Sequence, residues 1–232
     1  DAGRRQDRAT QDKHDDTLGF YTPILKGFLT EMGLEAANLG MQVFGGHGYI
    51  HEHGMEQIAR DARIATLYEG TTGIQALDLL GRKVLLGTRG KCVRDFSRIM
   101  LRSAKAHWLA HGSIGRMARS TAKRAIEWNL LTLRIMRRVG KDRDLVGSAS
   151  VDYLMYSGYV MMAHFWVRQA AVAQTLLRNG KGAESAEFYR AKIQTAEFYF
   201  DRLLPRADAH RKSALAPTRS LMQMGNGDFA FS

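Results

Sequence analysis

One carboxylate stands apart from the other charges in this sequence of 232 residues. Glu69 follows Leu67 and Tyr68 and precedes Gly70, with no lysine or arginine within five positions on either side. A carboxylate in a tight turn beside apolar side chains is expected to be desolvated, and desolvation raises its pKa toward the working range of a general base. The pattern therefore makes Glu69 a candidate base, and an exposed loop glutamate is the alternative.

A glycine-rich stretch upstream is the second feature with possible chemistry. Gln42, Gly45, Gly46 and Gly48 form the pattern QxxGGxG at the end of an expected helix. Glycines at such a place are typical of a helix C-cap followed by a turn. They are also typical of a backbone that approaches a phosphate or a cofactor closely. The spacing alone leaves both interpretations open.

Three histidines in the same stretch have a spacing that resembles a metal site. His47, His51 and His53 form HxxxHxH. A structural zinc site usually has four ligands and a catalytic one has three plus water, all fixed by rigid elements. These histidines lie in a glycine-rich loop with no cysteine nearby. We therefore predict no metal site.

Helices are expected to position these residues, because helical periodicity covers nearly the whole sequence. The sequence has three prolines, and the alternation typical of half-buried strands is almost absent. Thr22 followed by Pro23 predicts the start of a helix that stops at the glycine pair 45–46. The cap of a helix that follows Glu69 is expected at Thr71 or Thr72, and Thr72 with Gln75 fits a capping box. Further helices are predicted at 91–111, 115–139, 145–178 and 184–204. The predicted fold class is all-α, a bundle of antiparallel helices.

The whole charge imbalance lies in one segment. The net charge is +11, and residues 91–143 hold fourteen Lys and Arg against three Asp and Glu, a surplus of 14 − 3 = 11. Within it, four cations and four apolar residues alternate at helical spacing, which predicts an amphipathic helix. The cationic face is either solvated or an electrostatic site for phosphates or DNA. The residues of the two faces are Arg94, Arg98, Arg102 and Lys105, and Val93, Phe96, Ile99 and Met100.

Cysteine content and hydropathy bear on the compartment. The single cysteine, Cys92, excludes an intramolecular disulfide and favours a reducing compartment, from which we predict a cytoplasmic location. Residues 153–167 are uncharged, but they are fewer than the roughly 20 needed to span a bilayer. They predict a helix buried on all sides. The sequence opens without an initiator Met or a signal-peptide pattern, which predicts that it is part of a longer chain.

Taken together, residues 42–83, QVFGGHGYIHEHGMEQIARDARIATLYEGTTGIQALDLLGRK, resemble the C-terminal domain of the acyl-CoA dehydrogenases, flavoproteins that desaturate acyl-CoA thioesters. The elements Q..GG.GY, RDAR and YEGT.GIQ keep the order and spacing of that family. The resemblance covers residues 20–90, and the sequence beyond, including FYFDRLLP, is similar to the extra C-terminal helical region of one branch. It implies three segments: 1–19, a linker or remnant of a preceding region; 20–90, part of the helical bundle; and 91–232, an additional helical domain.

The resemblance also implies a chemistry for the turn at Glu69. In the implied reaction, Glu69 removes the α-proton of the bound thioester while FAD takes the β-hydrogen as hydride. The backbone N–H of Glu69 would donate to the thioester carbonyl, an oxyanion-type stabilisation, with Tyr68 and Gly70 beside the substrate. The implied reaction is the conversion of an acyl-CoA to its trans-2-enoyl-CoA, as in fatty acid β-oxidation.

Cofactor and partners follow from the same resemblance. It implies FAD contacts from Thr71 and Gln75, and from Gln42, Gly45 and Gly46 across a subunit interface. A homodimer or tetramer, an acyl-CoA substrate and an electron-transfer flavoprotein or similar acceptor are therefore expected. Because no front half precedes residue 20, we expect the chain alone to be inactive.

Two other functions remain open at this stage. A DNA-binding flavoprotein, similar to the alkylation-response branch of the superfamily, would explain the basic segment 91–143. A helical oligomerisation module with a vestigial dehydrogenase signature is the other alternative.

Overall fold

The computed structural model describes residues 2–180 and 182–229. Within them every regular element is a helix, which confirms the all-α prediction. The first part of the chain comprises α1 (Ala2–Val43), α2 (Gly46–Tyr49), η1 (His51–His53), α3 (Met55–Ile64), α4 (Thr72–Leu77) and η2 (Asp78–Gly87). The second part comprises α5 (Lys91–Ala106), α6 (Ser113–Val139), α7 (Leu145–Asn179), α8 (Ala186–Phe198), η3 (Tyr199–Leu203), α9 (Arg206–Ser213), α10 (Arg219–Met222) and η4 (Asn226–Phe229).

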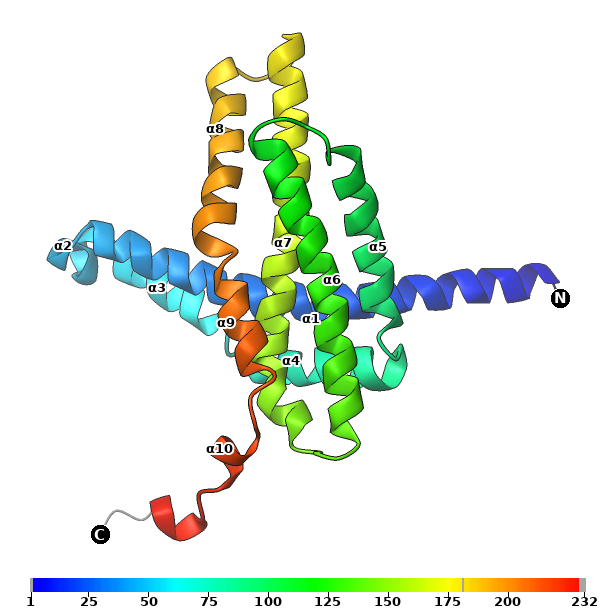
Figure 1. Cartoon of the computed structure of the whole chain (residues 1–232). Helices are drawn as coiled ribbons and strands as arrows, with labels where there is room; N and C mark the ends of the chain where they lie inside the picture. The colour runs from blue at the N-terminus through cyan, green and yellow to red at the C-terminus, as the bar shows by residue number, and fades with distance from the viewer. Residues whose placement is uncertain (1, 181, 230–232) are drawn as a thin grey trace.

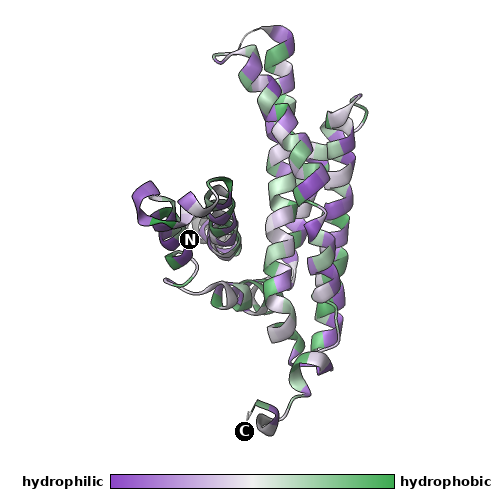
Figure 2. Cartoon of the chain, turned by 90° about the vertical axis from the view of Figure 1, so that its left-hand side faces the viewer, coloured by the Kyte–Doolittle hydropathy of each residue, from purple (hydrophilic) through white to green (hydrophobic). Residues whose placement is uncertain are grey.

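The two parts lie crosswise to each other. In Figure 1, α5, α6, α7 and α8 stand side by side, and α1 runs across them with α3 folded back along it. Figure 2, turned from that view, shows the crosswise helices nearly end-on beside one face of the upright ones. The helices predicted at 115–139 and 145–178 correspond to α6 and α7. The helix predicted at 91–111 ends earlier, at Ala106, and the one predicted at 184–204 divides into α8 and the π-helix η3.

α1 begins well before Thr22, so the predicted helix start is wrong. The helix runs through Pro23, which lies inside it. An interior proline costs about 3 kcal/mol because its ring removes a backbone donor and crowds the preceding turn. Phe20 and Ile24 on either side of it are almost fully buried, and burying such a side chain contributes about 1.5–3 kcal/mol. Tertiary packing on both sides therefore offsets the local signal to break the helix.

α1 and α7 cross closely because a small residue lies at each contact. A Cβ atom on Gly158 of α7 would stand 2.1 Å from the Cγ atom of Phe28 on α1. A Cβ atom on Gly27 of α1 would stand 2.8 Å from a methyl carbon of Leu154 on α7. The Phe28 ring also packs edge-on against Tyr159, with centroids 4.9 Å apart. This crossing fixes α1 against the upright helices.

The predicted burial of residues 153–167 is largely confirmed. Tyr153 and Tyr156 are fully buried in α7, and the Tyr153 hydroxyl lies 2.6 Å from that of Thr132 on α6. Phe165 is an exception, because 38% of it is exposed and it lines a groove between α7 and α8.

η2 differs from the regular helix predicted after Glu69. Asp78–Gly87 has π-helical geometry, closed by the N–H of Thr88 bonded to the carbonyl of Lys83 at 3.0 Å. Leu79, Leu80 and Val84 are fully buried in this segment. The wider helix keeps these apolar residues on the core side.

The basic segment forms the amphipathic helix that its spacing predicts. All four cations of the predicted polar face are exposed on α5, while Val93, Phe96 and Met100 are buried. Ile99 was expected on the apolar face and is instead half-exposed. Part of the charge is matched locally, since Asp95 pairs with Lys91 at 3.1 Å and with Arg98 at 2.6 Å.

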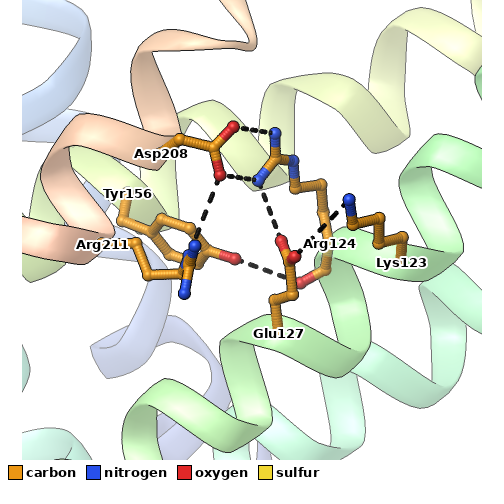
Figure 3. A network of polar contacts seen from close by, with 6 residues as sticks. All are labelled: Lys123, Arg124, Glu127, Tyr156, Asp208 and Arg211. Atoms are coloured by element: carbon orange, nitrogen blue, oxygen red, sulfur yellow. Dashed lines mark hydrogen bonds and ion pairs between the residues drawn. The ribbon is translucent and has the colours of Figure 1, made fainter.

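A polar network joins α9 to α6 (Figure 3). The guanidinium of Arg124 donates to both carboxylate oxygens of Asp208, at 2.6 and 2.7 Å, and to Glu127 at 2.9 Å. Arg211 lies 3.8 Å from Asp208, and the Tyr156 hydroxyl donates to the carbonyl of Arg124. The Arg124 guanidinium holds the pKa of the Asp208 carboxyl below its usual range. A bidentate pair of this kind fixes the orientation of both partners.

Candidate functional site

The turn between α3 and α4 carries Glu69 in a conformation that few residues other than glycine adopt. α3 is followed by a bond from the Tyr68 N–H to the carbonyl of Ile64 at 3.2 Å. The next two residues, Glu69 and Gly70, have φ values of 54° and 91°. A left-handed φ at a non-glycine residue costs on the order of 1–3 kcal/mol, and such residues cluster at functional sites. The structure therefore sets the candidate base in a strained turn.

Three side chains hold this turn in place. The Lys26 ammonium, from α1, donates to the carbonyl of Gly70 at 2.6 Å. The Gln75 amide, from α4, donates to the carbonyl of Glu69 at 3.2 Å. The Thr71 hydroxyl accepts the Ile74 N–H and so forms the N-cap of α4. A hydrogen bond to a charged group contributes about 1.5–3 kcal/mol, which is enough to offset the strain.

The predicted capping box at Thr72 and Gln75 is wrong. The N-cap is Thr71, the other of the two threonines expected there, and the Gln75 side chain turns back to Glu69. The Thr72 hydroxyl instead donates to the Glu31 carboxylate on α1. Tertiary contacts to α1 and to the turn therefore replace the local reciprocal cap.

The described residues do not provide the desolvation expected for Glu69. Glu69 is exposed, because the turn projects from the surface at the junction of α3 and α4. Its apolar neighbours Leu67, Tyr68 and Ile74 are themselves about half-exposed. The arrangement is a carboxylate set among uncovered apolar side chains.

The glycine-rich loop presents open backbone. Gly45 has φ 59° and ψ −142°, a conformation that is essentially restricted to glycine. A Cβ atom on Gly45 or Gly46 would meet no heavy atom within 4 Å, and Gln42 is exposed. Gly48 is different, because its Cβ would stand 2.4 Å from the carbonyl oxygen of Met41. Gly48 thus serves packing, while Gly45 and Gly46 leave space for another molecule to approach the backbone.

The loop and the turn lie at opposite ends of α3. The helix has 10 residues, which corresponds to a length of about 15 Å. The structure brings Glu69, Gly70, Thr71 and Gln75 together in one place, and α3 separates Gln42, Gly45 and Gly46 from them.

The three histidines make separate contacts. The rings of His47 and His53 pack edge-on with centroids 5.2 Å apart, and His51 Nδ1 lies 3.1 Å from the Glu56 carboxylate. In the described part of the chain, no three His, Cys, Asp or Glu side chains are grouped so that they can hold a metal ion.

A groove of about 790 Å³ runs between α1 and the segment that ends in α3. Its lining includes Leu34, Asn38, Met41, Tyr49, Arg60 and Arg63. No pattern in the sequence predicts this groove or the contacts of Lys26 and Glu31 with the turn. These two residues lie 44 and 41 positions from their partners in the turn, so no local pattern links them.

Two further features bear on the predictions about membrane spanning and about the single cysteine. Among the described residues, no helix combines the length and the apolar character that crossing a membrane requires. Cys92 is a free thiol that accepts a hydrogen bond from Thr88 at 3.0 Å, and burial raises its pKa.

Two family models together cover most of this all-helical chain, and both describe C-terminal dehydrogenase domains. Residues 4–85 match the family model described as acyl-CoA dehydrogenase, C-terminal domain. Residues 93–225 match the model described as acetyl-CoA dehydrogenase C-terminal like. The chain belongs to the acyl-CoA dehydrogenase family.

Relatives from three bacteria match most of the chain. The 3-methylmercaptopropionyl-CoA dehydrogenase of Ruegeria pomeroyi is 35% identical over 190 residues, which are 82% of this chain and 32% of that protein. The broad-specificity linear acyl-CoA dehydrogenase of Mycobacterium tuberculosis is 27% identical over 219 residues, 89% of this chain and 34% of its own length. A butyryl-CoA dehydrogenase of Syntrophomonas wolfei is 27% identical over 207 residues, 86% of this chain and 32% of its own length. The chain therefore spans about a third of the length of these relatives.

Proposed function

We propose that this chain forms the C-terminal part of an FAD-dependent acyl-CoA dehydrogenase. The enzyme oxidises an acyl-CoA thioester to the trans-2-enoyl-CoA, as in fatty acid β-oxidation. The observation that carries the proposal is the left-handed turn that presents Glu69, with Lys26 and Gln75 bonded to its backbone. Family membership and the names of the relatives support it.

In this proposal Glu69 performs two tasks. Its carboxylate takes the α-proton of the thioester, and its backbone N–H donates to the thioester carbonyl oxygen. That hydrogen bond stabilises the charge that develops on the oxygen as the proton leaves. Within the described residues the Glu69 N–H has no acceptor, so it is available to a substrate. The adjacent Tyr68 and Gly70 line the approach to the turn.

The residues that would hold FAD are present in two sets. Thr71 and Gln75 flank the turn, and both keep hydrogen-bonding capacity beyond their present contacts. Gln42, Gly45 and Gly46 offer exposed backbone and an exposed amide at the far end of α3. Bound FAD would supply the hydride acceptor for the β-hydrogen of the substrate. Because α3 separates the two sets, we propose that one copy supplies each set and that the enzyme is a homodimer or tetramer.

Uncovered apolar side chains support a larger protein around this chain. Leu25 and Leu29 on α1, Ile58 and Ile64 on α3, and Ile74 on α4 are all about half-exposed. These side chains lie on helices that contact one another, and apolar surface gathered in this way usually marks a contact with other protein or with ligand. We propose that further protein covers it, completes the acyl and flavin pocket and desolvates Glu69, so that the chain alone is inactive. The proposed segments are those of the resemblance, 1–19, 20–90 and 91–232.

The substrate and the electron acceptor are proposed from the relatives and the family. The relatives are named for 3-methylmercaptopropionyl-CoA, linear acyl-CoA and butyryl-CoA, so we propose an unbranched acyl-CoA. An electron-transfer flavoprotein or similar acceptor would reoxidise the cofactor. The proposed location is the cytoplasm.

The test is the visible spectrum of a full-length protein that contains this chain. Unbranched acyl-CoAs of increasing length are added without oxygen, with free CoA as the control. Bleaching of the flavin band by at least one acyl-CoA, and not by CoA, is the expected result. A bound flavin that none of them bleaches would contradict the proposal.

A further inference from the structure

Lys26 touches both sequence neighbours of Glu69. Its ammonium donates to the carbonyl oxygen of Gly70 at 2.6 Å. The same ammonium lies 5.8 Å from the centre of the Tyr68 ring, within the range of a cation–π contact. One side chain from α1 therefore holds the residue before the proposed base and the residue after it.

Lys26 is itself firmly placed. It lies on α1 between Ile24 and Phe28, both nearly fully buried, and Phe28 packs into the gap left by Gly158. The adjoining Gly27 packs against Leu154. The stem of Lys26 is thus anchored to a part of α1 that contacts the core, while its ammonium reaches the surface turn.

The contacts on the turn are not equivalent. The Gln75 amide bonds Glu69 from within the same local segment and at 3.2 Å. Lys26 reaches the turn from a separate helix, with a charged donor and a shorter distance. Charged donors make stronger hydrogen bonds than neutral ones. Lys26 therefore ties Gly70 of the turn to α1, two residues before the Thr72–Glu31 contact that ties the start of α4 to the same helix.

We infer that Lys26 is a positioning residue for Glu69. By holding Gly70 and Tyr68 it keeps the Glu69 carboxylate and the Glu69 N–H directed toward the same place. Proton transfer depends on such placement, and an error of about 1 Å can slow a reaction by about 10²-fold. This inference rests on the proposed function, because it assumes that Glu69 is the base.

The test uses the full-length protein with Lys26→Met, Lys26→Arg and, as a matched control, Lys91→Met. Lys91 is an exposed lysine that pairs with Asp95 on α5. For Lys26→Met we expect flavin reduction by the acyl-CoA to slow by roughly 10- to 100-fold, with KM and FAD content close to wild type. Lys26→Arg keeps the charge and the donors, so it should recover part of the rate. Lys91→Met should match wild type.

Hydrogen exchange provides a readout that does not depend on turnover. In Lys26→Met, peptides covering residues 65–75 should exchange faster, while peptides of α6 and α7 remain at the wild-type rate. If Lys26→Met does not fold, Lys26→Gln, which retains a shorter neutral donor, takes its place with the same expectations. Wild-type rates of both flavin reduction and turn exchange in the folded variant would overturn the inference.

Glu69→Gln, measured alongside, distinguishes failure of the positioning role of Lys26 from failure of the proposed function. If it abolishes flavin reduction while Lys26→Met has no effect, the inference fails and the proposed function stands. If the acyl-CoA reduces the flavin of the Glu69→Gln variant at the wild-type rate, the proposed function fails. A positioning role for Lys26 in catalysis then fails with it.

Discussion

Arg124 and Asp208 form a bidentate contact that joins α6 to α9 (Figure 3). Arg124 is largely buried, whereas Asp208 is partly exposed. Removing the carboxylate charge leaves Arg124 with Glu127 as its remaining acidic partner. We expect Asp208→Asn to lower the free energy of unfolding by about 1.5–3 kcal/mol, the contribution of a hydrogen bond to a charged group. Denaturant titration at neutral pH measures this change.

A matched control is available in the pair Arg116–Asp201, which also joins α6 to a later element. Both of its side chains are about half-exposed. An exposed ion pair contributes roughly 0–1 kcal/mol, so Asp201→Asn should have a much smaller effect. Equal losses in the two variants would show that burial of Arg124 does not strengthen its contact.

The contribution of the Arg124–Asp208 pair to stability has a defined pH dependence. Arg124 lowers the pKa of Asp208 in the folded state, so the unfolded state binds the proton more readily. The stabilisation is fully present above the unfolded pKa of about 3.9 and is lost as the pH falls through the lower folded value. The difference in unfolding free energy between wild type and Asp208→Asn should therefore persist from pH 7 to about pH 4 and shrink below it. A difference that shrinks between pH 7 and pH 5 would contradict this assignment.

At the residue scale, local patterns predicted which residues gather at the turn but not how they are held. The tight turn after Tyr68 follows from an apolar run that meets Gly70 and a threonine cap. The left-handed φ of Glu69 does not, because glutamate has no preference for that conformation. Lys26 and Glu31 were missed because their contacts depend on how α1 packs against α4.

At the scale of elements, the crossing of α1 and α7 makes a prediction about glycine. Gly158→Ala would force a methyl group into Phe28, and overpacking of this kind costs about 1–3 kcal/mol. Gly147, on the same helix, has no heavy atom within 4 Å of its Cβ position. Gly147→Ala should therefore be neutral or stabilise by up to about 1 kcal/mol. Thermal and denaturant unfolding of the two variants compare them directly, and similar values for both would contradict a tight crossing.

Element boundaries were predictable where the amphipathic period is strong and failed where tertiary contacts override local signals. α6 and α7 lie where the apolar periodicity places them. Pro23 and Thr72 are the failures, because burial beside Pro23 and the contact to Glu31 outweigh the local rules. The π-helical geometry of η2 has no counterpart in the apolar pattern, which also fits an ordinary helix.

At the scale of the molecule, the proposed boundary at residue 90 is not a gap in packing. α7 packs against α1 and against α6, and Arg206 of α9 donates to Glu35 of α1 at 2.6 and 2.8 Å. We therefore expect the parts on either side of residue 90 to unfold together. Trp108, Trp128 and Trp166 all lie after residue 90, whereas circular dichroism reports helices in both parts.

The two signals provide the measurement. Tryptophan fluorescence and circular dichroism should follow the same denaturation curve, as expected for a cooperative transition. A fluorescence transition displaced from the dichroism transition would show that residues 91–232 unfold as a separate unit.

The most direct test of the whole account is the rate of anaerobic flavin reduction in full-length Glu69→Gln, using an acyl-CoA that bleaches the wild type. Glu52→Gln, an exposed glutamate near the glycine loop, is the control. Removing a general base typically costs about 10²–10⁴-fold. We predict a loss of that size for Glu69→Gln and none for Glu52→Gln. Reduction by Glu69→Gln within tenfold of wild type would mean that another group removes the α-proton, and it would contradict the central claim.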